Sequence, residues 1–135
     1  LGGLTLSMIA ENIEAPASHK FVLIAPATKT TTTFEGFFNL MRFSPELKKA
    51  YNELVESKAG KPISYFEADR AITHFKGKVL WVHDQDDPVC PYKDLENFKN
   101  KDPENTIFLI TNDLGHNKIY KTQAVIDKIV SFLAS

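Results

Sequence analysis

Three short runs of apolar and β-branched residues constrain the fold of this chain more than any other feature. They are KFVLIAPA (residues 20–27), KVLWVH (78–83) and TIFLIT (106–111). None of them alternates apolar with polar residues, so each is typical of a strand that is buried on both faces. Helical patterns follow the second and third runs, as PYKDLENFKN and QAVIDKIVSFL. Strands that alternate with helices predict an α/β fold, with a parallel sheet of three strands flanked by helices.

A further helical pattern over residues 4–13 is apolar on nearly all sides, so we expect that helix to be buried. The segment 28–77 is too long for a simple crossover and carries helical stripes of its own. Ser44 and Pro45 are typical of a helix start, Gly60 is typical of a stop, and a third short helix fits residues 63–75. These helices could pack on the sheet, or they could form a lid that lines an apolar substrate pocket. We treat residues 28–77 as a helical lid insert within one domain.

Composition excludes several classes of protein. The chain is 43% hydrophobic, and 16 Lys and Arg residues against 17 Asp and Glu residues are interspersed, so we expect neither nucleic acid nor an anionic membrane as a partner. Its apolar runs are far shorter than the roughly 20 residues of a membrane span. The single cysteine, Cys90, cannot form an internal disulfide, which favours a cytoplasmic location. The sequence has no phosphate-binding glycine loop and no cluster with metal-ligand spacing, so we expect no cofactor and no metal.

Polar side chains with catalytic potential follow the second and third predicted strands. The loops are HDQDDPVCP and TNDLGHNKIY. Neighbouring parallel strands end at the same edge of a sheet, about 4.8 Å apart, and ligands in such sheets bind beyond that edge. An acidic residue after one strand can therefore meet a histidine after the next. A carboxylate in that position holds an imidazole in one tautomer and stabilises its cation during general-base catalysis.

These two loops resemble the C-terminal signature of the α/β-hydrolases, in which an H-G-x-x-D-x-x-V-P loop supplies the triad acid and a G-H pair supplies the base. The resemblance assigns Asp87 as the acid and His116 as the base. One position departs from the pattern, because Asp84 stands where glycine is usual, and Asp is tolerated in a turn. The chain follows the family's order of elements from its first residues to its last, so the resemblance implies that residues 1–135 are the C-terminal half of such a domain.

The opening residues, LGGLTLSMIAENI, resemble the downstream side of the family's nucleophile elbow, often G-x-S-x-G-G. The resemblance implies that the residue before Leu1 is the nucleophilic serine and that the backbone N–H of Leu1 is an oxyanion donor. We therefore expect an esterase-like or lipase-like serine hydrolase that forms an acyl-enzyme from a small acyl substrate, with the 135-residue chain inactive by itself. The strand at residues 20–27 would expose an unpaired edge, which predicts a homodimer or a bound N-terminal half.

Several alternatives remain open in the sequence. Asp84 and Asp86 could replace Asp87 as the acid, whereas Asp113 is typical of a turn before Gly115. We interpret His83 as structural, His19 and His74 as ordinary partly exposed residues, Cys90 as a small apolar residue, and Gly2 and Gly3 as permitting a close approach of helix and strand. A nucleophilic Asp before Leu1 would indicate a dehalogenase or an epoxide hydrolase. Gly or Ala there would favour a non-catalytic α/β-hydrolase-like binding module.

Overall fold

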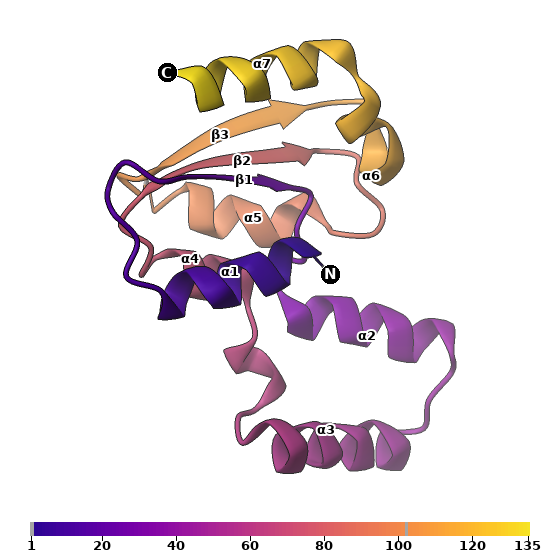
Figure 1. The fold of residues 1–135 in the computed structure, drawn as a ribbon. Helices are drawn as coiled ribbons and strands as arrows, with labels where there is room; N and C mark the ends of the chain where they lie inside the picture. Colours follow the sequence, from indigo (N-terminus) through magenta and orange to yellow (C-terminus); the bar gives the residue numbers. More distant parts are fainter. Residues whose placement is uncertain (1, 102) are drawn as a thin grey trace.

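Three parallel strands form the sheet of the computed structural model, which describes residues 2–101 and 103–135. The strands are β1 (Lys20–Ile24), β2 (Lys78–Asp84) and β3 (Thr106–Thr111), and they lie in the order β1-β2-β3 (Figure 1). In the register Val82 pairs with Ile24 on one side and with Leu109 on the other. The predicted α/β class, with a parallel sheet of three strands, is confirmed.

Helices cover both faces of the sheet. The helices α1 (Gly2–Asn12), α4 (Ala68–Ile72) and α5 (Tyr92–Lys99) lie on one face, and α7 (Gln123–Ala134) covers the other (Figure 1). Side chains of β2 divide between the two cores because successive residues of a strand point to opposite faces. Val79 and Trp81 pack with α4 and α5, whereas Leu80 and Val82 pack with α7 and the 3-10 turn Ile119–Lys121.

This alternation also decides where the polar end of β2 points. His83 lies two residues after Trp81 and therefore points to the same face of the sheet, where its ring lies beside Tyr92 of α5. Asp84 lies two residues after Val82 and points to the same face of the sheet as Val82. It therefore faces the segment that follows β3, where α6 (Gly115–Lys118) begins. Both residues are fully buried, so each needs polar partners within the protein.

The predicted insert divides into two parts. The helices α2 (Thr30–Leu40) and α3 (Pro45–Ala59), with the 3-10 turn Ile63–Tyr65, extend away from the sheet (Figure 1). Ser44 caps α3 by accepting from the N–H of Leu47, and Gly60 ends it with a φ of 67°. The short helix α4, by contrast, packs against α1 and contributes Ala68 and Ile72 to the core. Within 28–77, the projecting part is therefore the segment 30–65.

Two details differ from the sequence-based expectations. The first strand ends at Ile24 rather than at residue 27, because Ala25 has a φ of 44° and Pro26 has no N–H to extend the ladder. The helix α1 is not buried on all sides: Ser7 and Ala10 face the core, while Ile9, and Ile13 just after the helix, are 50% and 44% exposed. Small residues on the packed side let α1 lie close to its neighbours, and Leu4 and Leu6 are partly buried against the same core, whereas Ile9 faces outward.

Gly3 brings the start of α1 against the segment after β1, and this contact gives a first prediction. A Cβ at Gly3 would come within 2.8 Å of Pro26 Cβ, which belongs to a rigid, buried ring. We expect Gly3→Ala to destabilise the fold by about 1–2 kcal/mol, because the clash outweighs the gain of about 1 kcal/mol in helix propensity. Gly2→Ala is the control, since a Cβ there meets nothing within 4 Å. Equal urea midpoints for the two variants, followed by circular dichroism, would contradict the close packing.

Candidate active site

Two carboxylates shape the loop after β2, because each accepts hydrogen bonds from backbone N–H groups two or three residues later in the sequence. The Oδ1 atom of Asp84 accepts from the N–H of Asp86 at 3.0 Å, and the Oδ1 atom of Asp87 accepts from the N–H groups of Val89 and Cys90, both at 2.8 Å. Asp is favoured in loops because its short side chain makes such local bonds. The second of these turns fixes the Asp87 carboxylate and leaves its Oδ2 atom free to bind a more distant residue.

Asp87 and His116 meet across the carboxyl edge of the sheet. The Oδ2 atom of Asp87 lies 2.8 Å from Nδ1 of His116. The Asp87 side chain is fully buried, whereas the imidazole is 29% exposed. A carboxylate only accepts, so Nδ1 carries the proton and the neutral ring presents its lone pair at Nε2. The structure thus brings together the two residues that the sequence predicted as acid and base.

Asp84 has a different task from the one that the sequence suggested. Its Oδ2 atom accepts from Thr111 Oγ1 at 2.6 Å and from the Leu114 N–H at 3.2 Å, and its Oδ1 atom accepts from the Gly115 N–H at 3.0 Å. It is therefore a buried strand residue that holds the start of α6, one residue before His116. Burial alone would raise the pKa of Asp84, but the bonds from Thr111, Gly115, Asp86 and Leu114 hold it below its ordinary value.

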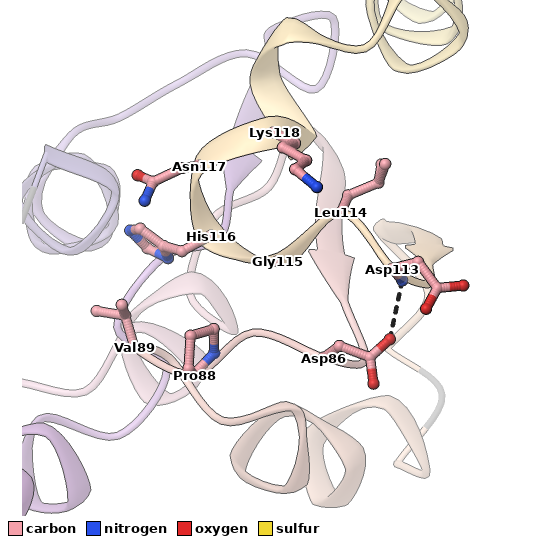
Figure 2. Close-up of a pocket in the computed structure, with 9 residues that line it drawn as sticks. All are labelled: Asp86, Pro88, Val89, Asp113, Leu114, Gly115, His116, Asn117 and Lys118. Atoms are coloured by element: carbon pink, nitrogen blue, oxygen red, sulfur yellow. Dashed lines mark hydrogen bonds between the residues drawn. The ribbon is translucent and has the colours of Figure 1, made fainter.

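A single hydrogen bond joins the remaining acidic residues of the two loops, Asp86 and Asp113. Asp86 is exposed, and its Oδ2 atom accepts from the N–H of Asp113 at 2.8 Å. Asp113 has a φ of 63° and Gly115 a φ of 59°, so the segment before His116 makes a tight turn. This contact (Figure 2) lies beside a hollow of about 370 Å³, which is lined by residues of the Asp86–Val89 loop and of the first turn of α6. The exposed side of His116 opens into this hollow.

His83 holds the loop that carries Asp87 through a hydrogen bond to its backbone. Its Nδ1 atom lies 3.5 Å from the indole N–H of Trp81, which can only donate, so the proton of the neutral ring is on Nε2. That N–H donates to the carbonyl of Cys90 at 2.8 Å. Burial lowers the pKa of His83, which keeps the ring neutral in this arrangement. His83 thus fixes the carbonyl of the same residue whose N–H binds Asp87.

Other residues singled out in the sequence lie away from this pair. His19 and His74 are exposed, and His74 lies near Glu11 on α1. Leu1, the predicted oxyanion donor, lies outside the described residues. The beginning of α1 is nevertheless located through Gly3, whose contact with Pro26 brings it to the end of β1 from which the chain leaves the sheet. Asp87 and His116 follow β2 and β3 at this same edge.

Cys90 is part of a grouping that sequence spacing did not indicate. Ligand atoms of Asp87, Cys90 and His116 lie within 4.8 Å of one another. The thiol is buried, and this burial, together with the charge of Asp87, raises its pKa to about 11. Asp87 and Cys90 are three positions apart, but His116 comes from another loop, so no local motif could have revealed the group.

Within residues 2–101 and 103–135, every helix is too short or too polar to cross a bilayer.

Comparisons with known proteins place this geometry in a known fold. No protein-family model matches the sequence, and no curated protein matches it. Among solved structures, an acetyl xylan esterase from Paenibacillus sp. R4 is similar, with a TM-score of 0.64 and 16% sequence identity. The similarity covers 96% of this chain and 42% of the esterase, so the chain spans less than half the length of that protein. At this identity the likeness shows the fold alone, and the chain therefore has an α/β fold similar to that of part of this esterase.

Proposed function

We propose that this chain supplies the acid and the base of a serine-hydrolase triad, and that the complete enzyme cleaves esters or similar acyl compounds. One observation carries the proposal: a fully buried carboxylate, Asp87, holds Nδ1 of a partly exposed imidazole, His116, at 2.8 Å. A buried acid that orients a base whose other nitrogen remains available is the arrangement that nucleophilic acyl transfer needs. The esterase-like fold supports the same reaction class.

In this mechanism His116 takes the proton of the attacking hydroxyl at Nε2. Asp87 remains ionised, keeps Nδ1 protonated and stabilises the imidazolium that forms. His116 then returns the proton to the leaving group, and in the second half-reaction it activates the water that hydrolyses the acyl-enzyme. The N–H groups of Val89 and Cys90 assist, since they satisfy the second oxygen of Asp87 and stop its carboxylate from rotating away.

The nucleophile in this proposal is a serine directly before Leu1, with the N–H of Leu1 as an oxyanion donor. Two features support the assignment: the resemblance of LGGL to a nucleophile elbow, and the position of Gly3 against Pro26 after β1. The elbow would then lie at the carboxyl edge of the sheet that carries Asp87 and His116. The proposed enzyme needs no cofactor, and its free cysteine suits a cytoplasmic location.

The projecting helices offer a site for an apolar acyl group, which supports their proposed role as a lid. A cavity of about 340 Å³ lies between the start of α1 and the helices α2 and α3. It is lined mostly by apolar and aromatic side chains: Leu4, Ala27, Thr30, Thr33, Phe34, Phe37 and Tyr51. Cavities of this size and character suit small apolar ligands. Leu4 is four positions after the proposed nucleophile in the sequence, which supports an acyl chain that extends into this cavity.

Phe34 provides a test of the acyl cavity. We expect Phe34→Leu in the complete enzyme to raise KM about tenfold for a medium-chain ester and to leave acetyl-ester hydrolysis unchanged, since one lost apolar contact is worth about 1–3 kcal/mol. Phe43→Leu is the matched control, because Phe43 stacks on Phe38 in the same aromatic group but does not line the cavity. Equal chain-length profiles for the two variants would place the acyl group elsewhere.

The outer edge of β1 supports a proposal about partners. Within the described residues β1 pairs with β2 alone, so its other edge carries free backbone groups beside apolar side chains. We propose that this edge pairs with an N-terminal half or with a second copy of the chain. Sedimentation of the 135-residue chain should therefore show a dimer, or a complex when the upstream segment is added. A monodisperse monomer that ignores the upstream segment would contradict the pairing.

The decisive experiment is to extend the chain upstream and assay it with activated esters. A protein with serine before Leu1 should show burst kinetics and label with a fluorophosphonate, whereas the 135-residue chain alone should do neither. A burst from the chain alone would overturn the proposal. Asp before Leu1 would redirect it to dehalogenase or epoxide-hydrolase chemistry. Gly or Ala there, with no turnover, would favour a non-catalytic binding module.

A further inference from the structure

Three different ligand types converge at the proposed catalytic pair. A carboxylate oxygen of Asp87, Sγ of Cys90 and a ring nitrogen of His116 all lie within 4.8 Å of one another. The ring nitrogen nearest the carboxylate is Nδ1, at 2.8 Å from Oδ2. Ligand atoms around one tetrahedral metal ion lie roughly 3–4 Å apart, as follows from bond lengths of about 2.0–2.3 Å. A small opening of the Asp87–His116 pair would therefore make room for an ion.

The donor set selects a class of metal. A thiolate and an imidazole are soft or borderline ligands, and they favour zinc over the hard cations magnesium and calcium, which prefer oxygen ligands. Three protein ligands would leave a fourth tetrahedral position open, as zinc sites with a bound water do. The partly exposed face of His116 and the adjoining hollow give an ion access from the solvent (Figure 2).

Both backbone polar groups of Cys90 are already held by hydrogen bonds. Its N–H donates to Asp87 at 2.8 Å, and its carbonyl accepts from Nε2 of His83 at 2.8 Å. The backbone at Cys90 therefore need not be ordered when an ion binds, which lowers the entropic cost of binding. The carboxylate of Asp87 places a negative charge beside Cys90, and this charge favours a divalent cation between the two side chains.

We propose that Asp87, Cys90 and His116 form an inhibitory zinc site, in which the bound ion takes the place of the proton between acid and base. The binding step stands on the geometry of these residues alone. The inhibitory effect rests on the proposed function, because it requires His116 to act as a general base.

Zinc binding changes the protonation of Cys90 and of His116. Cys90 binds as a thiolate and releases its proton to solvent. Nδ1 of His116 gives up its proton to bind zinc, and the ring takes a proton at Nε2, so the imidazole stays neutral but changes tautomer. One proton is released in total. Nε2 then carries hydrogen and has no lone pair with which to accept a proton from a nucleophile. Zinc must displace the thiol proton and the Asp87–His116 hydrogen bond, so binding is reversible and weaker than at a closed structural site.

Cobalt absorption tests the binding step directly. Co²⁺ added to the purified 135-residue chain should give a thiolate-to-cobalt charge-transfer band at one ion per chain, and Zn²⁺ should displace it. Cys90 is the single cysteine, so this band assigns the ligand without any substitution. Absence of the band at saturating Co²⁺ would overturn the proposal even if every variant failed to fold.

Substitutions then identify the other ligands. We expect Cys90→Ser and His116→Gln each to weaken Zn²⁺ binding by about 100-fold or more, since even indirect partners of a metal site contribute about 10–100-fold. His19→Gln is the control for adventitious histidine binding, because His19 is exposed and lies away from the site. Unchanged affinity in a folded Cys90→Ser variant, or an equal loss in His19→Gln, would contradict the assignment.

An activity assay separates this inference from the proposed function. In an upstream-extended protein that hydrolyses esters, Zn²⁺ should inhibit the parent and should not inhibit the Cys90→Ser variant at the same concentration. Full activity of the zinc-saturated parent would overturn the inhibitory role and leave the hydrolase proposal intact. A protein that shows the cobalt band but hydrolyses no ester would retain the metal site and reject the hydrolase.

Discussion

Asp87→Asn should reduce turnover of the upstream-extended protein by about 10⁴-fold, the loss that follows the same change in serine proteases. An Asn amide at this position can donate to Nδ1 of His116, which would force the proton onto Nε2 and remove the lone pair that the nucleophile needs. KM should change little, because Asp87 is fully buried and cannot touch substrate. Steady-state kinetics with an activated ester, together with a folded circular dichroism spectrum, measure this effect.

Asp86→Asn is the matched control for that experiment. Asp86 is adjacent in sequence but exposed, and within the described residues its carboxylate accepts one hydrogen bond, from the Asp113 N–H. We expect its turnover to remain within about twofold of the parent, as for most surface substitutions that touch no catalytic group. A large loss in Asp86→Asn combined with near-normal turnover in Asp87→Asn would move the acid to the neighbouring residue.

The arrangement of the sheet and the pairing of Asp87 with His116 could both be predicted from the sequence. Buried parallel strands carry a strong signal, as VLWV in β2 does, because both of their faces must be apolar. The two loops then had to meet, since β2 and β3 pair in parallel and end at the same edge. The meeting of the two loops follows from this topology, whereas the choice of Asp87 among the acidic residues of its loop came from the resemblance to the α/β-hydrolase signature.

The roles of Asp84 and Cys90 could not be predicted, because they depend on which face of a strand or loop each side chain occupies. Asp84 looked like a turn residue, but β2 continues to residue 84 and its alternation points the carboxylate at the loop before α6. Cys90 looked like a small apolar residue, and its place beside His116 comes from a turn that the Asp87 side chain makes with the backbone. A shift of one residue in β2 would turn Asp84 to the opposite face of the sheet, and a different turn at Asp87 would move Cys90 away from His116.

Asp84→Ala should destabilise the fold more than any other substitution at this site. Four donors bind the Asp84 carboxylate: Thr111 Oγ1 and the N–H groups of Asp86, Leu114 and Gly115. Alanine would leave these groups, several of them partly buried, without a partner, which we expect to cost about 4 kcal/mol. For a domain of this size that corresponds to a fall in Tm of roughly 15 °C. Asp86→Ala, which removes a single exposed bond, should cost about 0.5 kcal/mol by the same thermal measurement.

The pH dependence of stability tests whether Asp84 acts as an ionised group. Its pKa in the folded protein lies below the ordinary value of 3.8, so its stabilising effect is complete above that value and is lost as pH falls through the folded-state pKa. The free energy of unfolding of the parent should therefore fall more steeply below about pH 4 than that of Asp84→Asn, which has no such proton to take up. Parallel acid curves for the two proteins would mean that the carboxylate is not held as an anion. The start of α6, and with it the position of His116, would then depend on the turn at Asp113 and Gly115 and on the bond from the Asp113 N–H to Asp86.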